Sequence, residues 1–252
     1  MTKRSFAYRL LPLLGLVAFL LVWEAMPRLG LASRVLLPAP SDLPDAFMRE
    51  LANGMWLKSV GLSLSHYTLG LLVGLGAGIG LGVLTGMSNV AEGLFAWVSR
   101  VLRPIPGLAW VPFAIIWFGV SQSGAVFIIA IGVFWIVYFA THGAIRGVDR
   151  DYIELAKAFG FTGPLERLFK VLLPAATPGI LVGARTALGQ AWMAVVAAEL
   201  FGVTGLGSRM MQASSLLATD IVVVYMLTMA ALYGLMDTFF MAAQGRLLRW
   251  KP

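Results

Sequence analysis

The 252-residue sequence contains no cysteine, and only 12% of its residues are Asp, Glu, Lys or Arg. Without cysteine, disulfides, thiolate metal sites and cysteine nucleophiles are all excluded. A soluble domain carries about 25% charged residues, whereas this chain is 59% hydrophobic. So few polar residues could not cover the surface of a soluble protein of this size. The composition therefore predicts an integral membrane protein with several spans.

Motifs for covalent chemistry are missing as well. The sequence has no Gly-Lys dipeptide, which excludes a P-loop for nucleotides. Its two histidines, His66 and His142, lack a plausible Ser and Asp partner and lack metal-ligand spacing. We therefore predict a non-enzymatic chain with no catalytic residue, no metal and no bound cofactor. His66 is expected to hydrogen-bond within a helix bundle.

Apolar segments predict an all-α membrane protein with about six transmembrane helices. The first segment follows three basic residues but lacks the small-residue cleavage site of a signal peptide, so we interpret it as a span. The third is short and begins among prolines, which predicts an irregular entry. Residues 45–51 predict a short interfacial helix outside the spans. The six segments are residues 10–23, 60–87, 105–120, 125–144, 179–201 and 221–243.

Lysine and arginine are distributed unevenly between the two sides of this topology. With a cytoplasmic N-terminus, thirteen fall in segments facing the cytoplasm and five in segments facing outward, and Arg185 lies within a span. This bias follows the positive-inside rule, and it explains the net charge of +7 without nucleic acid as a partner. We predict a multi-pass protein of the bacterial cytoplasmic (inner) membrane with both termini in the cytoplasm.

Glycines recur at every fourth position of the second span, which places them on nearly one helix face. Such a face lets another helix approach closely, and close packing replaces the hydrophobic drive that lipid does not provide. The pattern predicts helix packing within one subunit; a subunit interface or a hinge is the alternative. The residues are Gly70, Gly74, Gly78, Gly82 and Gly86.

The longest polar stretch, residues 146–178, is too amphipathic to be a slack linker. Residues 152–159 form helix readily after two aspartates that suit a helix N-terminus, and Gly160 is a natural helix stop. A second short helix is predicted over residues 165–173, ending before Pro174. Two short helices between spans predict either a docking surface or a hairpin lying on the membrane.

Glu154, Ala156 and Gly160, followed by Leu173-Pro174, resemble the E-x-A-x3-G…L-P loop of ABC importer permeases. One residue more than in the commonest form separates the glycine from the proline, which predicts a bulge near Gly163-Pro164. Further segments resemble the nitrate/sulfonate/taurine branch of these permeases: LPAPSDL at 37–43, RPIPGLAWVPFAIIWFG at 103–119, ALGQAWMAVVAAELFG at 187–202 and ATDIVVVYM at 218–226.

The resemblance implies a type I ABC importer (MetI-like) permease fold. Residues 1–59 would form the first span and an external amphipathic segment, residues 60–245 the permease core with its coupling loop, and residues 246–252 a cytoplasmic tail. The implied partners are a second copy of the chain, two cytoplasmic ATPases that bind ATP and Mg, and an external substrate-binding protein. The implied ATPase-coupling residues are Tyr152, Glu154, Ala156, Lys157, Gly160, Phe161 and Pro174.

Ionisable residues within spans are costly in lipid and are therefore candidates for function. Arg185 and Glu199 lie fourteen residues apart in the fifth span, about 21 Å along a helix, so they cannot pair with each other. Arg185 is predicted either to pair with Asp237 or another acid, or to line an anion path. Glu199 is predicted to act at the outer mouth as a gate or structural residue. Gln190 and Trp192 are candidates for the path, although packing is the commoner role of such a tryptophan.

The sequence thus predicts the permease subunit of an ATP-driven importer of a small oxyanion, of the aliphatic sulfonate, taurine or nitrate class. It would couple closure of the ATPases to alternating access. Two alternatives remain at this point. One is a secondary active transporter driven by an ion gradient, which predicts paired acids in the middle of the membrane. The other is a membrane anchor for a cytoplasmic complex.

Overall fold

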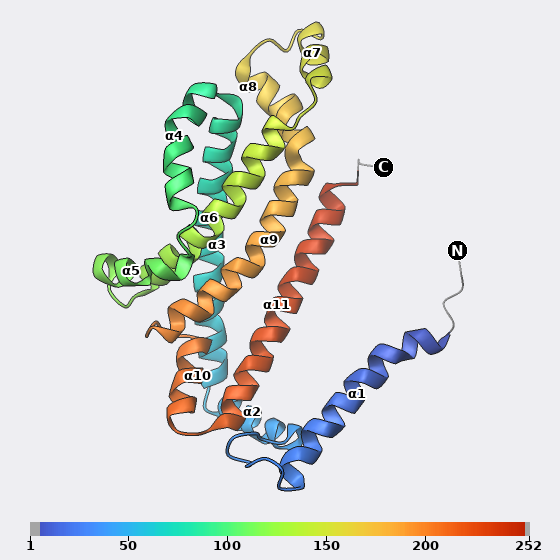
Figure 1. Ribbon diagram of the computed structural model, residues 1–252, viewed down its shortest axis with the longest axis vertical. Coiled ribbons are helices and arrows are strands. Elements are labelled where there is room, and N and C mark those ends of the chain that lie inside the picture. The colour runs from blue at the N-terminus through green and yellow to red at the C-terminus, as the bar shows by residue number, and fades with distance from the viewer. Residues whose placement is uncertain (1–5, 250–252) are drawn as a thin grey trace.

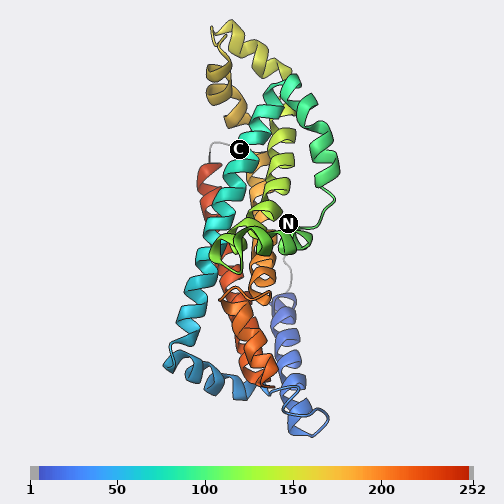
Figure 2. The same cartoon turned by 90° about the vertical axis from the view of Figure 1, so that its left-hand side faces the viewer.

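The computed structural model describes residues 6–249, and within this range every regular element is helical. Five helices are long and apolar enough to cross a membrane. Four of them gather into a bundle, and α1 leans away from the others (Figures 1 and 2). The fold is thus that of an all-α membrane protein. The five are α1 (Phe6–Arg28), α3 (Met55–Met87), α6 (Gln122–Arg146), α9 (Leu173–Leu200), which continues a helical stretch that begins at Pro164, and α11 (Thr219–Leu247).

The predicted span over residues 105–120 has the irregular entry that its prolines indicate, but it is not one helix across the bilayer. The chain instead forms α4 (Asn89–Leu102), bends by 90°, and continues as a short turn, η2 (Gly107–Trp110), and the eight-residue α5 (Val111–Phe118). Prolines at 104, 106 and 112 lack the N–H that a continuous helix needs. Eight residues span only about 12 Å, so α5 cannot cross the bilayer alone. Six spans result only when this bent pair counts as one.

The two ends of the bundle carry different short helices. One end, called the α7 end here, carries α7 (Arg150–Ala158) and α8 (Pro164–Arg167). The opposite end, the α2 end, carries the turn η1 (Pro40–Asp42), α2 (Leu43–Ala52) and α10 (Leu206–Ser215). Helix α2 forms where residues 45–51 predict an interfacial helix. There the indole N–H of Trp23 in α1 donates to the Pro38 carbonyl at 3.0 Å.

The core of the bundle is the contact between α3 and α6. Each ladder glycine of α3 faces one residue of α6, and both series advance by four residues. A Cβ added to Gly74 would lie 2.7 Å from the Val133 Cβ, and one added to Gly78 would lie 2.9 Å from the Val137 Cβ. No side chain fits between these backbones. The facing residues, in order from Gly70 to Gly86, are Ile129, Val133, Val137, Thr141 and Ile145.

An adjacent face of α6 packs against α9 through small residues. A Cβ added to Gly179 of α9 would lie 2.8 Å from the Ala144 Cβ, and Gly183 faces Ala140 in the same way. Helix α6 is therefore held between two close neighbours, and its Val133 and Val137 are fully buried. Residues 129–145 form the rigid centre to which the other elements attach.

The sequence predicts that the second helix of the polar stretch ends before Pro174, and this prediction is wrong. Helix α8, a π-helical turn η3 (Leu168–Leu172) and α9 run on without a break, so that one helical segment extends from Pro164 to Leu200. A π turn closes hydrogen bonds five residues apart instead of four. The widened turn directly precedes Pro174 and lies within the stretch that is one residue longer than the commonest family spacing. Gly163 and Pro164, where the bulge is predicted, form the N-cap and first residue of α8.

We expect Gly78→Leu to destabilise the bundle, because its side chain would be forced against the Val137 Cβ and the Phe134 carbonyl oxygen. Overpacking of this kind costs about 1–3 kcal/mol or more. Gly76→Leu is the matched control, since a Cβ at Gly76 meets nothing within 4 Å. The measurement is the thermal unfolding midpoint in detergent. Equal midpoints for the two variants would contradict the packing assigned to the α3–α6 contact.

Candidate functional site

Helix α7 begins and ends with local signals in its own sequence. The Asp149 carboxylate accepts a hydrogen bond from the Asp151 backbone N–H at 3.1 Å, which caps the first turn. At the other end Gly160 adopts φ +86°, a left-handed conformation that favours glycine. The chain then reverses, and the Phe161 N–H donates to the Ala156 carbonyl at 2.9 Å. These two ends make α7 a short, defined helix beyond the spans (Figure 1).

One face of α7 exposes large apolar side chains. Tyr152 is 59% exposed, Leu155 is 55% exposed and Phe159 is 72% exposed, whereas Ala156 is buried against the rest of the chain. Glu154 and Lys157 are exposed. An apolar helix face of this kind, rimmed by charges outside the spans, is typical of an interaction surface. Residues 150–160 are called the α7 face below.

Four of the seven coupling candidates meet on the side of α7 that faces α9. Tyr152, Ala156, Phe161 and Pro174 line one cavity of about 520 Å³ between α7 and the start of α9, and the exposed Leu155 and Phe159 border the same cavity. The Lys170 ammonium lies 4.3 Å from the centre of the Phe161 ring, a cation–π contact that holds the loop to η3. Glu154, Lys157 and Gly160 lie outside this cavity.

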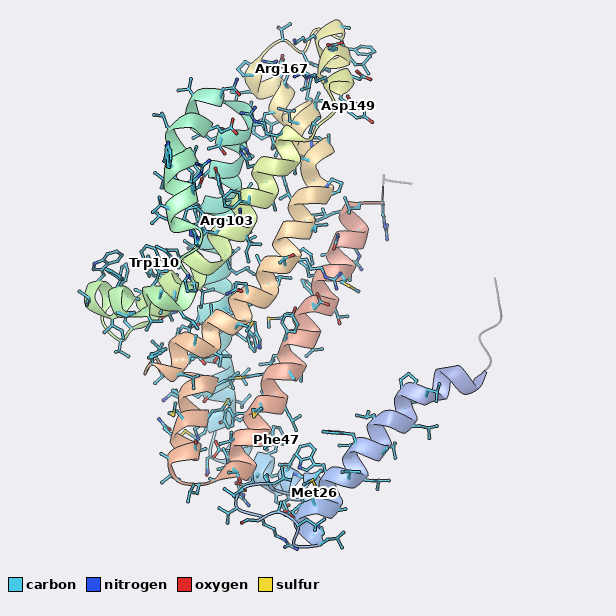
Figure 3. All side chains as sticks on the ribbon, viewed as in Figure 1. Met26, Phe47, Arg103, Trp110, Asp149 and Arg167 are labelled. Carbon is cyan, nitrogen blue, oxygen red and sulfur yellow. The ribbon has the colours of Figure 1, made fainter. Side chains whose placement is uncertain are left out.

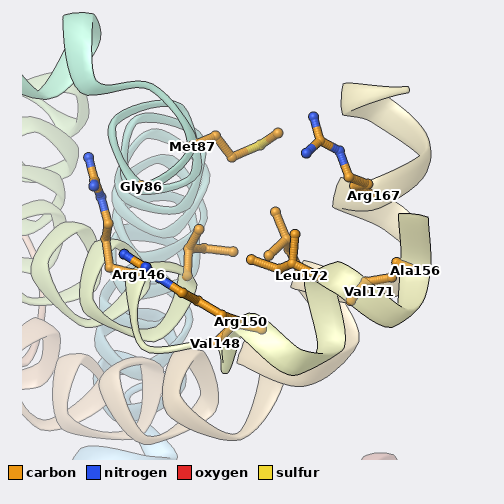
Figure 4. Close-up of a pocket in the computed structure, with 11 residues that line it drawn as sticks. Gly86, Met87, Arg146, Val148, Arg150, Ala156, Arg167, Val171 and Leu172 are labelled. Carbon is orange, nitrogen blue, oxygen red and sulfur yellow. The ribbon is translucent and has the colours of Figure 1, made fainter. Parts of the chain in front are cut away.

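A second cavity, of about 290 Å³, separates α7 from the ends of α3 and α6 (Figure 4). Three arginines border it: Arg146, Arg150 and Arg167. Arg146 hydrogen-bonds to the Asn89 side chain at 2.7 Å and forms an ion pair with Glu92. Apart from these arginines the lining is mostly apolar. The cavity leaves α7 only partly packed against the ends of the spans.

Arg185, the one basic residue predicted within a span, pairs with Asp237 of α11. Its Nε and one terminal nitrogen donate to the two carboxylate oxygens at 3.0 and 3.1 Å. The bidentate pair links α9 to α11 and neutralises both charges within the spans. Of the two roles predicted for Arg185, this geometry matches the structural pair.

Glu199 is completely buried at the α2 end of α9 and belongs to a hydrogen-bond network. Its carboxylate accepts from the Ser63 hydroxyl at 2.7 Å and from the Gly207 backbone N–H at 2.9 Å, and it lies 3.1 Å from Nδ1 of His66. The network ties α3, α9 and α10 together. Because the serine donates to the carboxylate and not to the histidine, the group does not form a nucleophilic triad.

Gln190 and Trp192, the remaining path candidates, lie in different surroundings. Trp192 is 7% exposed and its ring packs edge-on against Tyr67, with ring centres 5.5 Å apart. It is therefore a core residue. Gln190 borders a cavity formed with the bend between α4 and α5.

The sequence alone did not reveal a buried charge cluster at the α2 end. Glu50 of α2 is 2% exposed and accepts two hydrogen bonds from Arg209 of α10, at 2.6 and 2.9 Å, and one from the Tyr225 hydroxyl at 2.8 Å. The Arg209 hydrogen bonds lower the pKa of the Glu50 carboxyl, and Glu50 in turn raises the pKa of Arg209. Residues this far apart give no spacing signal, so only the fold brings them together.

This arrangement defines a class of protein: a multi-span helical membrane subunit with a protruding helix at one end of the bundle. The sequence model of one family, described as the binding-protein-dependent transport system inner membrane component, matches residues 70–251. The chain belongs to this family of ABC importer permeases. It is accordingly an inner-membrane component of an ABC transport system.

Individual proteins support the same assignment. The permease SsuC of Bacillus subtilis, named for aliphatic sulfonate transport, is 34% identical over 91% of this chain and 83% of its own length. The taurine transport system permease TauC of Escherichia coli is 32% identical over 94% of this chain and 88% of its own. Among solved structures, the inward-facing MetNI methionine ABC transporter matches with a TM-score of 0.64 at 21% identity, covering 78% of this chain and 97% of that one. The last comparison establishes the MetI-type fold.

We expect Arg209→Gln to lower the free energy of unfolding by about 3 kcal/mol, because it leaves the buried Glu50 carboxylate unpaired. The wild-type contribution is present above the ordinary glutamate pKa, about 4.3. It is lost as the pH falls through the lowered pKa of Glu50, since protonation then removes the charge. The measurement is unfolding in detergent at pH 7 and at pH 3.

The control is Arg49→Gln, which breaks an exposed ion pair between Arg49 of the same helix α2 and Asp220. Exposed pairs contribute at most about 1 kcal/mol. A loss for Arg209→Gln that is no larger than the control, or that is the same at both pH values, would show that the Glu50 pair does not hold α2 to α10.

Proposed function

We propose that this chain is the permease subunit of an ATP-driven importer, in which the α7 face receives force from an ATPase. The observation that carries the proposal is the α7 face itself. Tyr152, Leu155 and Phe159 are exposed on a helix that lies beyond the spans. Outside the bilayer such side chains need a protein partner to cover them.

The ATPase would dock over residues 152–163 on the cytoplasmic side, and ATP and Mg would be bound by the ATPase alone. The positive-inside bias supports this orientation. Arg146, Arg150, Arg167 and Lys170 all lie at the α7 end, where the rule places the cytoplasm. The described end of α11 lies towards the same side of the bundle (Figure 1), consistent with cytoplasmic termini.

The connections of α7 suggest how the force reaches the membrane. On one side α7 leads through Pro164 into a single helical segment that reaches Leu200. A helix of this length moves as a lever, because its backbone hydrogen bonds resist bending. Two copies related by a twofold axis would enclose the path, and movement of both α7 faces would switch it between inward- and outward-facing states.

The substrate class follows from the relatives. SsuC and TauC are named for sulfonates, and both match more than nine-tenths of this chain. We infer that the cargo is a small oxyanion, of the aliphatic sulfonate, taurine or nitrate class, delivered to the α2 end by an external binding protein. The acidic residues within the spans fit this function. Glu199 and Asp237 are each satisfied by local partners, so they do not form the paired acids of an ion-driven carrier.

Glu154→Lys and Gly160→Asp should each uncouple transport while leaving membrane insertion normal. The first reverses a charge on the α7 face, and the second strains a backbone at φ +86°. We expect at least a tenfold loss of both uptake and binding-protein-stimulated ATP hydrolysis in the reconstituted complex. Glu166→Lys, the same charge reversal at an exposed acid of α8 outside the α7 face, is the control and should retain both activities. Full activity in both α7 variants would show that the ATPase does not act through α7.

The isolated chain provides a further test against the two alternatives. Reconstituted in liposomes without an ATPase, it should not accumulate taurine or ethanesulfonate under a proton or sodium gradient. Gradient-driven accumulation would establish a secondary transporter and contradict the proposal. With ATPase and binding protein added, ATP-dependent uptake is expected, and its absence with a fully assembled complex would favour the membrane anchor.

A further inference from the structure

A cavity lies at the bend between α4 and α5, about halfway along the bundle. The bend, α6 and α9 form its walls, and its volume is about 410 Å³, within the range of small-molecule sites, roughly 300–1,000 Å³. Gly132 borders the cavity, and the next residue, Val133, packs against Gly74 near the midpoint of the 33-residue α3. The cavity is therefore close to the centre of the bilayer.

Two hydrogen-bond donors in this cavity wall lack an acceptor. The indole Nε1 atoms of Trp110 and Trp135 are buried, and no atom of residues 6–249 accepts from either of them. Five buried side-chain polar atoms are unpartnered in the described part of the chain, and these two line the same cavity. Buried donors without an acceptor are rare in proteins, and lipid cannot supply one. Their depth also separates them from the tryptophans that mark the membrane interface.

The other polar groups of the cavity are donors as well. The Arg103 guanidinium lies 4.3 Å from the centre of the Phe139 ring, and none of the ion pairs among residues 6–249 involves it. The Gln190 amide lies beside Gly132, where a Cβ would come within 3.9 Å of Nε2. Within the described range no acidic side chain lines the cavity. A positive charge with several N–H groups and no carboxylate favours an anion.

The neighbouring cavity extends this environment towards the α7 end. It has a volume of about 590 Å³, lies between α4 and α6, and shares Arg103 and Phe139 with the cavity at the bend. Arg100 and His142 add basic groups there, and its one acid, Glu92, is paired with Arg146. Arg103 and Trp110 lie on either side of the bend, next to α6 (Figure 3). An anion at the bend would thus have a basic surface beside it in the direction of the cytoplasm.

We propose that the cavity at the bend binds the transported oxyanion during its passage. Arg103 balances the negative charge and the Gln190 amide donates to the oxyanion oxygens, while a rotation of the Trp110 and Trp135 rings turns their now covered indole N–H groups towards the same oxygens. A sulfonate has three oxygens for these donors. This inference rests on the proposed function, since it assumes that the chain carries small oxyanions.

The test is equilibrium binding of ethanesulfonate to the full chain in complex with its ATPase, in nanodiscs and without the binding protein. Trp110→Phe and Trp135→Phe keep an aromatic ring and remove only the N–H donor. Each should raise the Kd about tenfold, the effect of losing one hydrogen bond to a charged group, and Arg103→Gln should raise it further. Trp117→Phe is the matched control, because Trp117 is an exposed tryptophan of α5 that does not border the cavity, and its Kd should equal that of the wild type.

Thermal unfolding without ligand separates a binding role from a structural one. Removing an unpartnered donor should leave the midpoint unchanged or raise it; a fall in the Trp110→Phe and Trp135→Phe midpoints would show that the indoles hold the fold, and would overturn the site. Gln190→Glu is a second variant of similar shape, and its negative charge should abolish ethanesulfonate binding. Competition by choline, a cation, as strong as by taurine would also overturn the site.

Failure of the site and failure of the proposed function give different results. If the wild-type complex with ATPase and binding protein takes up no ethanesulfonate, taurine or nitrate, the proposed function fails. If it takes up an oxyanion while all the cavity variants bind ethanesulfonate like the wild type, the function stands and the cavity at the bend is not the site.

Discussion

The close contact between α3 and α6 is the constraint on which the rest of the structure depends. Glycines at every fourth position of α3 let the backbone of α6 approach so closely that an added Cβ at Gly74 would lie 2.7 Å from Val133. In lipid no hydrophobic force drives helices together, so contact area and close packing must hold them. Because α6 is also packed against α9, this contact positions both the bend after α4 and the segment that leads to α7.

The functional candidates occupy places that this rigid centre leaves free. The α7 face projects beyond it, and the cavity at the bend opens where prolines prevent α4 and α5 from forming one helix against α6. Three charged clusters elsewhere are paired within the chain: Arg185 with Asp237, Glu50 with Arg209, and Glu199 with Ser63 and the Gly207 N–H. The indole N–H groups of Trp110 and Trp135, by contrast, have no acceptor within the described residues, and they are the donors that we propose bind the oxyanion.

Prediction succeeded where a local signal decides the local structure. Gly160 marked the end of α7 because its φ of +86° suits glycine, and the hydrophobic runs located five long helices. It was incomplete at prolines, whose effect depends on the neighbouring backbone. At Pro104 and Pro106 the chain bends by 90°, whereas at Pro174 a preceding π turn lets the helix continue. Sequence alone does not distinguish these outcomes.

The sequence by itself determined that this is a helical membrane protein, where its five long apolar helices lie, and which family it belongs to. Amino-acid composition, the length of hydrophobic segments and the spacing of motif residues depend only on the order of residues along the chain, so they are known without coordinates. Only the tertiary structure decided which groups meet. Glu50 and Arg209 are 159 residues apart, and Gln190 reaches the bend from a different helix than Trp110 or Trp135. Such sites form from segments distant along the chain, because helix packing, not sequence order, brings their side chains into contact.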